Sequence, residues 1–139
     1  MSRTISYRSN IKITVSDFVD LLKRSTLDER RPVDDPVRMQ KMLDHGNVMV
    51  TAWSGERLVG VSRAFTDYAF CCYLSDLAVD RNLQHQGIGK ELVKYTHETA
   101  GPDTMLILMA APGAVKYYPK IGMKTFPHCF ILDRKSKKG

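Results

Sequence analysis

The stretch that decides the fold runs from an apolar strand, through a polar loop with two glycines, into an amphipathic helix: Leu77-Ala78-Val79-Asp80-Arg81-Asn82-Leu83-Gln84-His85-Gln86-Gly87-Ile88-Gly89-Lys90. Backbone N–H groups at the start of such a helix have no partner within the helix, and the helix dipole adds positive potential there. Phosphate oxygens bind at this position, and glycine lets the main chain approach them closely. The stretch therefore predicts a phosphate-binding strand–loop–helix unit.

Two common phosphate-binding loops do not fit this stretch. A dinucleotide-binding loop needs a third glycine where this chain has Leu92, and the acidic residue expected after the next strand is missing. A Walker loop needs serine or threonine after Gly89-Lys90, where Glu91 stands, and a further glycine five positions before Gly89. An ordinary strand-to-helix turn stays open as the alternative to a phosphate site.

The segments around this stretch alternate between strand and helix patterns. A helix is predicted from Thr14, with Phe18 on its apolar face, and a second from Asp35 as N-cap to Gly46. The predicted order is β-α-α-β-β-β-α-β-α-β, with strands at 4–7, 48–53, 58–66, 71–79, 105–110 and 123–132 and later helices at 87–100 and 113–120. A helical crossover joins strands 71–79 and 105–110, so we expect these to be parallel neighbours. The wholly apolar run 105–110 is expected to be buried on both faces.

Length, composition and charge limit the class of protein. The 139 residues, 43% hydrophobic and 26% charged, fit one globular domain and exclude disorder over most of the chain. The formal net charge of +6 suits an anionic partner, either nucleic acid or a small phosphorylated cofactor. Part of the excess lies in a short basic tail from about residue 134, which we interpret as a solvated end.

Cysteine usage and the missing targeting signals point to a reducing, cytoplasmic location. The chain has no Cys-x-x-Cys, and none of its histidines stands at zinc-ligand spacing from another ligand, so no metal is expected. The apolar or aromatic neighbours of Cys71, Cys72 and Cys129 favour buried thiols. No apolar run approaches the ~18 residues of a transmembrane helix, so no membrane partner is expected.

Two motifs resemble those of the GNAT superfamily of N-acetyltransferases. The segment 84–89, Gln-His-Gln-Gly-Ile-Gly, matches the family signature Q/R-x-x-G-x-G/A directly after a strand. The segment 114–123, Ala-Val-Lys-Tyr-Tyr-Pro-Lys-Ile-Gly-Met, is similar to the family's A-x-x-F-Y-x-K-x-G-F. The resemblance implies a single α/β domain over 1–139, with a mixed central sheet, a splayed parallel strand pair and helices on both faces.

The resemblance also implies a binding mode for the cosubstrate acetyl-CoA. The pantetheine arm would lie in the opening between the splayed strands and bond to the first of them like an added strand. An amide near Leu77 or Ala78 would stabilise the oxyanion. The residues assigned to the coenzyme are Leu77, Ala78 and Val79 on the strand, Gln84, His85, Gln86, Gly87, Ile88, Gly89 and Lys90 around the pyrophosphate, and Tyr117, which core packing explains equally.

The same resemblance assigns two candidate catalytic residues. Tyr118 occupies the position of the family tyrosine that donates a proton to the departing thiolate, and a phenol stays protonated at neutral pH. Asp76 is the only carboxylate on the strand and thus the candidate general base. Strand alternation leaves open that Asp76 points away from the cleft, with Tyr73 or Ser75 ordering a water instead.

The sequence leaves the acceptor site and its specificity open. Arg30, Arg31, Asp34 and Asp35 lie in the predicted loop between the first two helices. The acidic pair suits an ammonium group and the arginine pair suits a carboxylate or phosphate, but ordinary loop polarity explains both.

The predicted function is acetyl transfer from acetyl-CoA to a primary amine of a small molecule or protein, by direct attack of the amine. The alternative is a non-catalytic acetyl-CoA-binding sensor or interaction module of the same fold. A nucleic-acid-binding domain is disfavoured, because no recognition-helix pattern or basic stripe with aromatic residues is present. A homodimer is compatible with the resemblance, since dimers are common in that superfamily.

Overall fold

A computed structural model describes residues 4–135 and places a five-stranded mixed sheet in the described chain. The strands follow one another in space in chain order, and each pair of neighbours is antiparallel except the last, which is parallel. This parallel pair confirms the expected crossover. The strands are β1 (Ile5–Ser9), β2 (Val48–Ser54), β3 (Arg57–Thr66), β4 (Cys71–Val79) and β5 (Met105–Leu108).

Capping residues set the helix starts where the sequence predicts them. The Thr14 hydroxyl accepts a hydrogen bond from the Asp17 N–H at 3.0 Å, and α1 spans Val15–Ser25. The Asp35 carboxylate accepts from the Arg38 N–H at 3.1 Å, and Pro36 opens α2 (Pro36–His45). Between them lies a short 3-10 helix, η1 (Leu27–Arg30), in place of part of the predicted loop.

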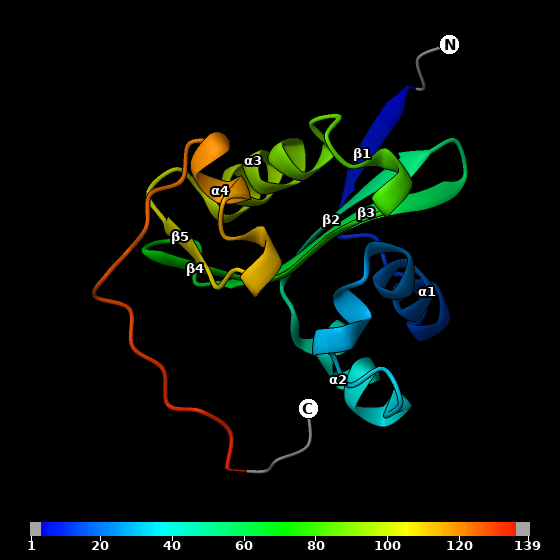
Figure 1. Ribbon diagram of the computed structural model, residues 1–139, viewed down its shortest axis with the longest axis horizontal. Coiled ribbons are helices and arrows are strands. Elements are labelled where there is room, and N and C mark those ends of the chain that lie inside the picture. Colours follow the sequence, from blue (N-terminus) through cyan, green and yellow to red (C-terminus); the bar gives the residue numbers. More distant parts are fainter. Residues whose placement is uncertain (1–3, 136–139) are drawn as a thin grey trace. The chain divides into compact units, whose positions relative to one another are not determined.

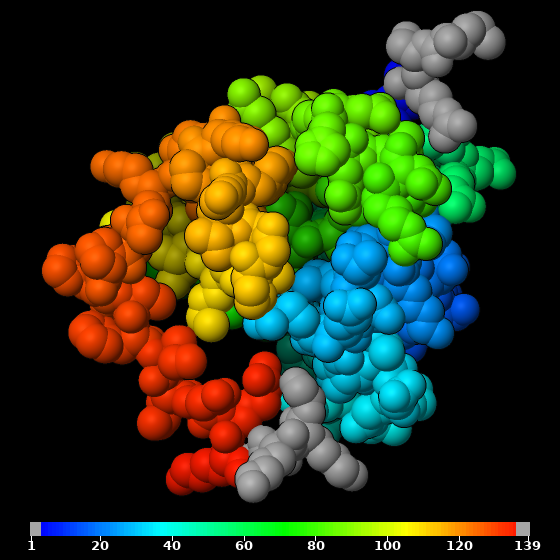
Figure 2. All heavy atoms as spheres, in the orientation of Figure 1, coloured from blue at the N-terminus to red at the C-terminus, as the bar shows by residue number. Residues whose placement is uncertain are grey.

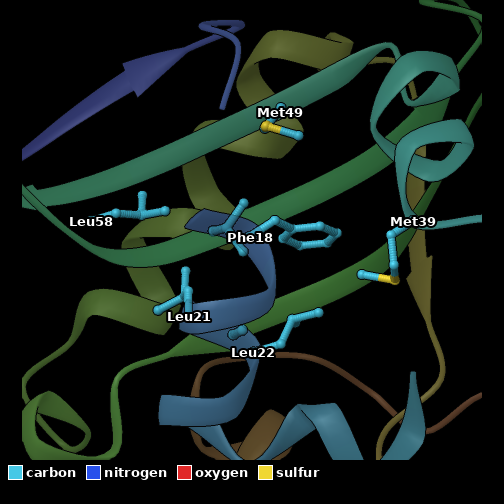
Figure 3. Close-up of a cluster of buried hydrophobic side chains, with 8 residues drawn as sticks. Phe18, Leu21, Leu22, Met39, Met49 and Leu58 are labelled. Carbon is cyan, nitrogen blue, oxygen red and sulfur yellow. The ribbon is translucent and has the colours of Figure 1, made fainter. Parts of the chain in front are cut away.

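Helices cover both faces of the sheet, as the resemblance implies (Figure 1). On one face, Phe18, Leu21 and Leu22 of α1 pack with Met39 of α2 against the strands (Figure 3). On the other face, α3 (Ile88–Ala100) buries Ile88 and Leu92 against side chains of β2 and β3. Because side chains alternate along a strand, each of these strands contributes apolar residues to both layers.

The chain divides into two compact units, residues 1–108 and 109–139. The second contains the 3-10 helix η3 (Pro112–Ala114) and the single-turn helix α4 (Tyr117–Lys120). Its described part has no strand, so the predicted strand or hairpin at 123–132 is wrong. Pro127 lacks an N–H for a strand ladder, and Phe130 and Leu132 are 89% and 96% exposed. The assignment of 1–139 to one domain stays a prediction.

The strand β5 is shorter and less buried than its apolar sequence predicts. It ends at Leu108, and Met105 and Ile107 are 60% and 43% exposed. Leu106 and Leu108 pack against the core cluster that includes Ala100 of α3. An apolar run alone cannot distinguish a strand covered on both faces from an edge strand covered on one, and here the second reading is correct.

The cysteine prediction holds at one of three positions. Cys72 is buried in the sheet, whereas Cys71 and Cys129 are exposed, so the expectation of three buried thiols is wrong for these two. In residues 4–135 no group of three or more metal-ligating side chains gathers. No helix in that range is long and apolar enough to span a membrane.

Three backbone N–H groups in the turn between β3 and β4 bond to one carboxylate. The Asp67 Oδ1 atom accepts hydrogen bonds from the N–H groups of Ala69, Phe70 and Cys71 at 2.9, 2.7 and 3.1 Å. The Phe70 N–H, followed by those of Ala69 and Cys71, lowers the pKa of Asp67 from 3.8 to about 2. These bonds require the ionised carboxylate, which fixes the start of β4.

We expect the Asp67 turn to withstand acid down to about pH 2. Because the folded-state pKa lies below the unfolded value, the stabilisation is complete above pH 4 and is lost as pH falls through about 2. Carboxyl NMR titration should give a midpoint near 2 for Asp67, and Asp67→Asn should remove this titration. A midpoint near 4 would contradict the assigned bonds.

Candidate functional site

The parallel pair separates halfway along β4 and leaves an open strand edge. Pairing with β5 ends at Leu74 opposite Leu108, whereas β4 continues to Val79. On its other side β4 stays paired with β3 to its end, and the Asp80 N–H donates to the Val59 carbonyl at 2.9 Å. Residues 75–79 of β4 therefore form the open edge.

Strand alternation tells which main-chain groups face this open edge. Counting back from Asp80, Ala78 directs its N–H and C=O toward β3, while Leu77 and Val79 direct theirs to the open edge. Gln84 Nε2 already donates to the Val79 carbonyl at 3.1 Å. The Leu77 N–H and C=O and the Val79 N–H are thus placed for an added strand-like ligand. The register does not support the predicted main-chain contact of Ala78.

The loop after β4 is fixed by Asp80, a residue outside the site predicted from the sequence. Its carboxylate accepts from the Asn82 N–H at 2.9 Å, at the start of the 3-10 helix η2 (Arg81–Leu83), and pairs with Arg24 of α1 at 2.8 Å. Burial raises the pKa of Asp80. The Asn82 N–H and the guanidinium groups of Arg24 and Arg57 lower this pKa by more, so the net shift is downward. An ionised Asp80 therefore anchors the loop.

The loop then presents backbone N–H groups at the start of α3. His85 and Gly87 adopt positive φ angles of 67° and 84°, and Gly87 caps the helix without a side-chain bond. The first intrahelical bond runs from the Glu91 N–H to the Gly87 carbonyl at 3.1 Å, so the N–H groups of residues 88–90 precede it. A Cβ atom added at Gly87 would meet nothing within 4 Å. Open space therefore lies at the Cβ position of Gly87, the residue that directly precedes these donors.

The first unit brings most of the predicted coenzyme residues together. Leu77 and Val79 supply the open edge, and the loop that follows carries the predicted phosphate residues. Figure 2 shows the segment that follows β4, in bright green, at the surface. The side chains of Gln84, His85, Gln86 and Lys90 are exposed, while Ile88 and Gly89 are buried and contribute through their backbone. An extended ligand with an anionic end fits this combination of strand edge and helix N-terminus.

Asp76, the candidate base, is fully buried between two arginines. Its Oδ1 accepts from Arg31 Nε and its Oδ2 from Arg63 Nε. Arg63 also donates to the Met42 carbonyl at 3.0 Å and the Ser75 hydroxyl at 3.3 Å. Because both oxygens are engaged by cations, this geometry favours a structural role for Asp76 over that of a base.

The charged residues of segment 30–35 do not act as the arginine pair and the acidic pair that the sequence suggests. Arg31 bonds to Asp76 and Ser75, and Asp35 caps α2, whereas Arg30 and Asp34 are exposed. The ion pair between Asp76 and Arg63 could not be predicted, because it joins positions 13 residues apart on two strands. An isolated arginine in the apolar strand run 58–66 is the one signal that could have suggested a buried partner.

We expect Asp76→Asn to act mainly on stability. Removing the carboxylate leaves two guanidinium groups without their counter-charge, which costs about 3 kcal/mol in buried pairs. Thermal denaturation should show the loss of stability. The fall of the reaction rate at acidic pH, the acidic limb of the pH–rate profile, should persist. If that limb disappeared with stability retained, Asp76 would be the general base after all.

In the second unit, Tyr117 and Tyr118 open α4. Their ring centroids lie 5.2 Å apart in an edge-to-face arrangement. Burial raises the pKa of both phenols, and the neighbouring Tyr117 raises that of Tyr118 further. Both hydroxyls are therefore protonated at neutral pH, as a proton donor requires.

The chain belongs to the GNAT acetyltransferase family. The family model described as the acetyltransferase (GNAT) domain matches residues 29–128 of the 139. This range includes β2 to β5, the loop 80–90 and both tyrosines of α4. The fold and the family predicted from the two motifs are thereby confirmed.

Relatives in sequence and in structure agree with this family. An uncharacterized N-acetyltransferase ycf52-like protein of Prochlorococcus marinus is 27% identical over 84% of this chain and 67% of its own length. A soybean (Glycine max) protein named histone acetyltransferase TAP1 is 32% identical over 52% of this chain, which covers 32% of that protein.

Solved structures show the same fold. A probable acetyltransferase of meticillin-resistant Staphylococcus aureus superposes with a TM-score of 0.77 at 22% identity, covering 96% of this chain and 100% of its own. The aminoglycoside N-acetyltransferase AAC(6')-Iy, solved in complex with CoA, superposes with a TM-score of 0.73 at 12% identity, with 98% of both chains covered. At these identities the likeness concerns the fold alone.

Proposed function

We propose that the protein is an N-acetyltransferase that moves an acetyl group from acetyl-CoA to a primary amine of a small molecule or protein. The observation that carries this proposal is the open edge of β4, which runs directly into the N–H groups at the start of α3. A strand edge followed by an anion-binding helix start suits the pantetheine arm and diphosphate of one coenzyme. The family membership and the CoA-bound relative support the choice of coenzyme.

Each part of the coenzyme has a proposed group on this chain. The Leu77 carbonyl and N–H and the Val79 N–H would bond to the amide groups of the pantetheine arm. The backbone from Gln84 to Lys90 would bind the diphosphate, and the Gln84 side chain holds the loop in place through the Val79 carbonyl. Acetyl-CoA itself supplies the activated thioester.

The proposed reaction needs two proton movements. The amine nitrogen attacks the thioester carbonyl carbon, the carbon–sulfur bond breaks, the nitrogen loses a proton and the thiolate gains one. We assign the donated proton to the Tyr118 hydroxyl, on the resemblance of segment 114–123 to the family motif. Because both Asp76 oxygens are engaged, we assign the amine proton to water, with Asp76 as the competing candidate.

The second candidate function is a non-catalytic acetyl-CoA sensor or interaction module. One observation favours it: Asp76, the carboxylate of β4, is paired with two arginines, which disfavours its action as a base. Both functions predict coenzyme binding, and only the enzyme predicts turnover.

Calorimetry and a thiol assay together test these functions. Titration with acetyl-CoA should give saturable heat, and acetyl-CoA mixed with amines, amino acids, polyamines and peptides should release free thiol in an acceptor-dependent way. Binding without thiol release for any acceptor would favour the sensor. Absence of binding would remove both functions.

A further inference from the structure

The buried network around Asp76 carries one more positive charge than negative. It contains the two guanidinium groups of Arg31 and Arg63 and the single carboxylate of Asp76. Asp76 and Arg63 are 0% and 4% exposed, so water screens their charges little. A net charge of one unit therefore acts on the surroundings of this network.

The network lies where the open edge of β4 begins. Arg31 donates to the Ser75 carbonyl at 2.8 Å, and Arg63 donates to the Ser75 hydroxyl. Ser75 directly follows Leu74, the last residue of β4 that pairs with β5. The excess charge is thus held two residues from Leu77, the edge residue to which the proposed function assigns the pantetheine arm.

Arg31 is the end of the network that solvent reaches. Its side chain is 20% exposed, compared with 4% for Arg63. Its bonds to Asp76, Ser75 and the Arg30 carbonyl leave further N–H groups of the guanidinium for an incoming partner. Three of the five guanidinium N–H groups are thereby used, and one N–H remains on each terminal nitrogen for the two oxygens of a carboxylate.

We propose that Arg31 is a specificity-determining residue that binds a carboxylate of the acceptor, so that the enzyme prefers amines bearing a carboxylate over polyamines. The proposal rests on the proposed acetyl transfer. The single excess charge of the network matches the single charge of a carboxylate, whereas a polyamine would bring further positive charge toward it.

Most of the other charged side chains between α1 and α2 are exposed to solvent. Glu29, Arg30, Asp34 and Asp35 are exposed, and Asp35 is engaged as the cap of α2. Asp28 is half-buried. Solvent and salt screen exposed charges strongly, so these groups influence an acceptor less than the buried network does. Asp34 is therefore a suitable control position.

The test measures a ratio of efficiencies rather than activity alone. Thiol release is followed with glycine, β-alanine and γ-aminobutyrate, with the corresponding amides, and with spermidine. We expect wild-type kcat/KM to favour the best acid over its amide by about tenfold, an effect of about 1.4 kcal/mol. Arg31→Gln should reduce this ratio to about one, Arg31→Lys should retain part of it, and Asp34→Asn should leave it unchanged.

The outcomes separate this proposal from the proposed function. A loss of folding in Arg31→Gln would lower all efficiencies together, whereas loss of carboxylate binding lowers only those of the acids. Turnover with equal efficiencies for acids and amides in the wild type would overturn the proposal and leave acetyl transfer standing. An unchanged ratio in Arg31→Gln would also overturn it. No turnover with any acceptor would overturn both.

Discussion

Gly87→Val is expected to weaken acetyl-CoA binding by about a hundredfold or more. Gly87 has φ +84°, a conformation that a β-branched residue adopts only with strain, and its missing Cβ faces open space before the N–H groups of α3. The valine methyl groups would occupy the space proposed for the diphosphate. The N–H groups at the start of α3 would then lose their hydrogen bonds to it. Calorimetry with acetyl-CoA measures the effect directly.

Gly55→Val is the matched control for this variant. Gly55 lies in the turn between β2 and β3 with φ +61°, and an added Cβ there also meets nothing within 4 Å. Both substitutions therefore carry a similar backbone strain, about 1–2 kcal/mol of stability. Only Gly87→Val should affect the coenzyme. Equal coenzyme affinity in the two variants would show that the loop does not bind the diphosphate.

Tyr118→Phe is expected to lower kcat by about a hundredfold or more and to leave the Kd of acetyl-CoA within about twofold. A general acid contributes to the transition state and not to ground-state binding of the coenzyme. Steady-state thiol release and calorimetry measure the two quantities separately. Tyr68→Phe is the control, because Tyr68 lies in the turn before β4 and its hydroxyl donates to the Asn47 carbonyl at 3.2 Å.

The pH profile gives Tyr118 a second test. The phenol can donate only while protonated, and burial and Tyr117 raise its pKa above the ordinary value of 10.0. Wild-type kcat should therefore hold through neutral and mildly alkaline pH and fall only above about 10. This alkaline fall should be absent from the residual activity of Tyr118→Phe. An unchanged profile and rate would remove Tyr118 from the mechanism.

Local signals in the sequence were sufficient for most of the first unit. The caps at Thr14 and Asp35, the strand 71–79 and the glycines before α3 each act within a few residues, so their structures follow from short-range chemistry. The parallel pairing of β4 and β5 followed from the helix between them. The position of the open edge was expected from the family resemblance, and its length is set by where β5 ends.

Features that depend on distant partners were beyond local signals. Which edge residues face outward depends on the register with β3, and this excludes Ala78 while selecting Leu77 and Val79. The hydrogen bonds from Arg31 and Arg63 to Asp76 join three separate segments of the chain. The apolar residues of 123–132 resembled a strand, but apolar pattern does not provide a pairing partner.

In the proposed binding mode, the coenzyme adds along the β4 edge and ends at the start of α3. Amide hydrogen exchange with and without acetyl-CoA tests it most directly. We predict slower exchange at Leu77, Val79 and residues 88–90 on binding, with little change at Ala78, whose N–H is directed to β3 in both states. Unchanged exchange at Leu77 and Val79 in the presence of saturating acetyl-CoA would contradict it.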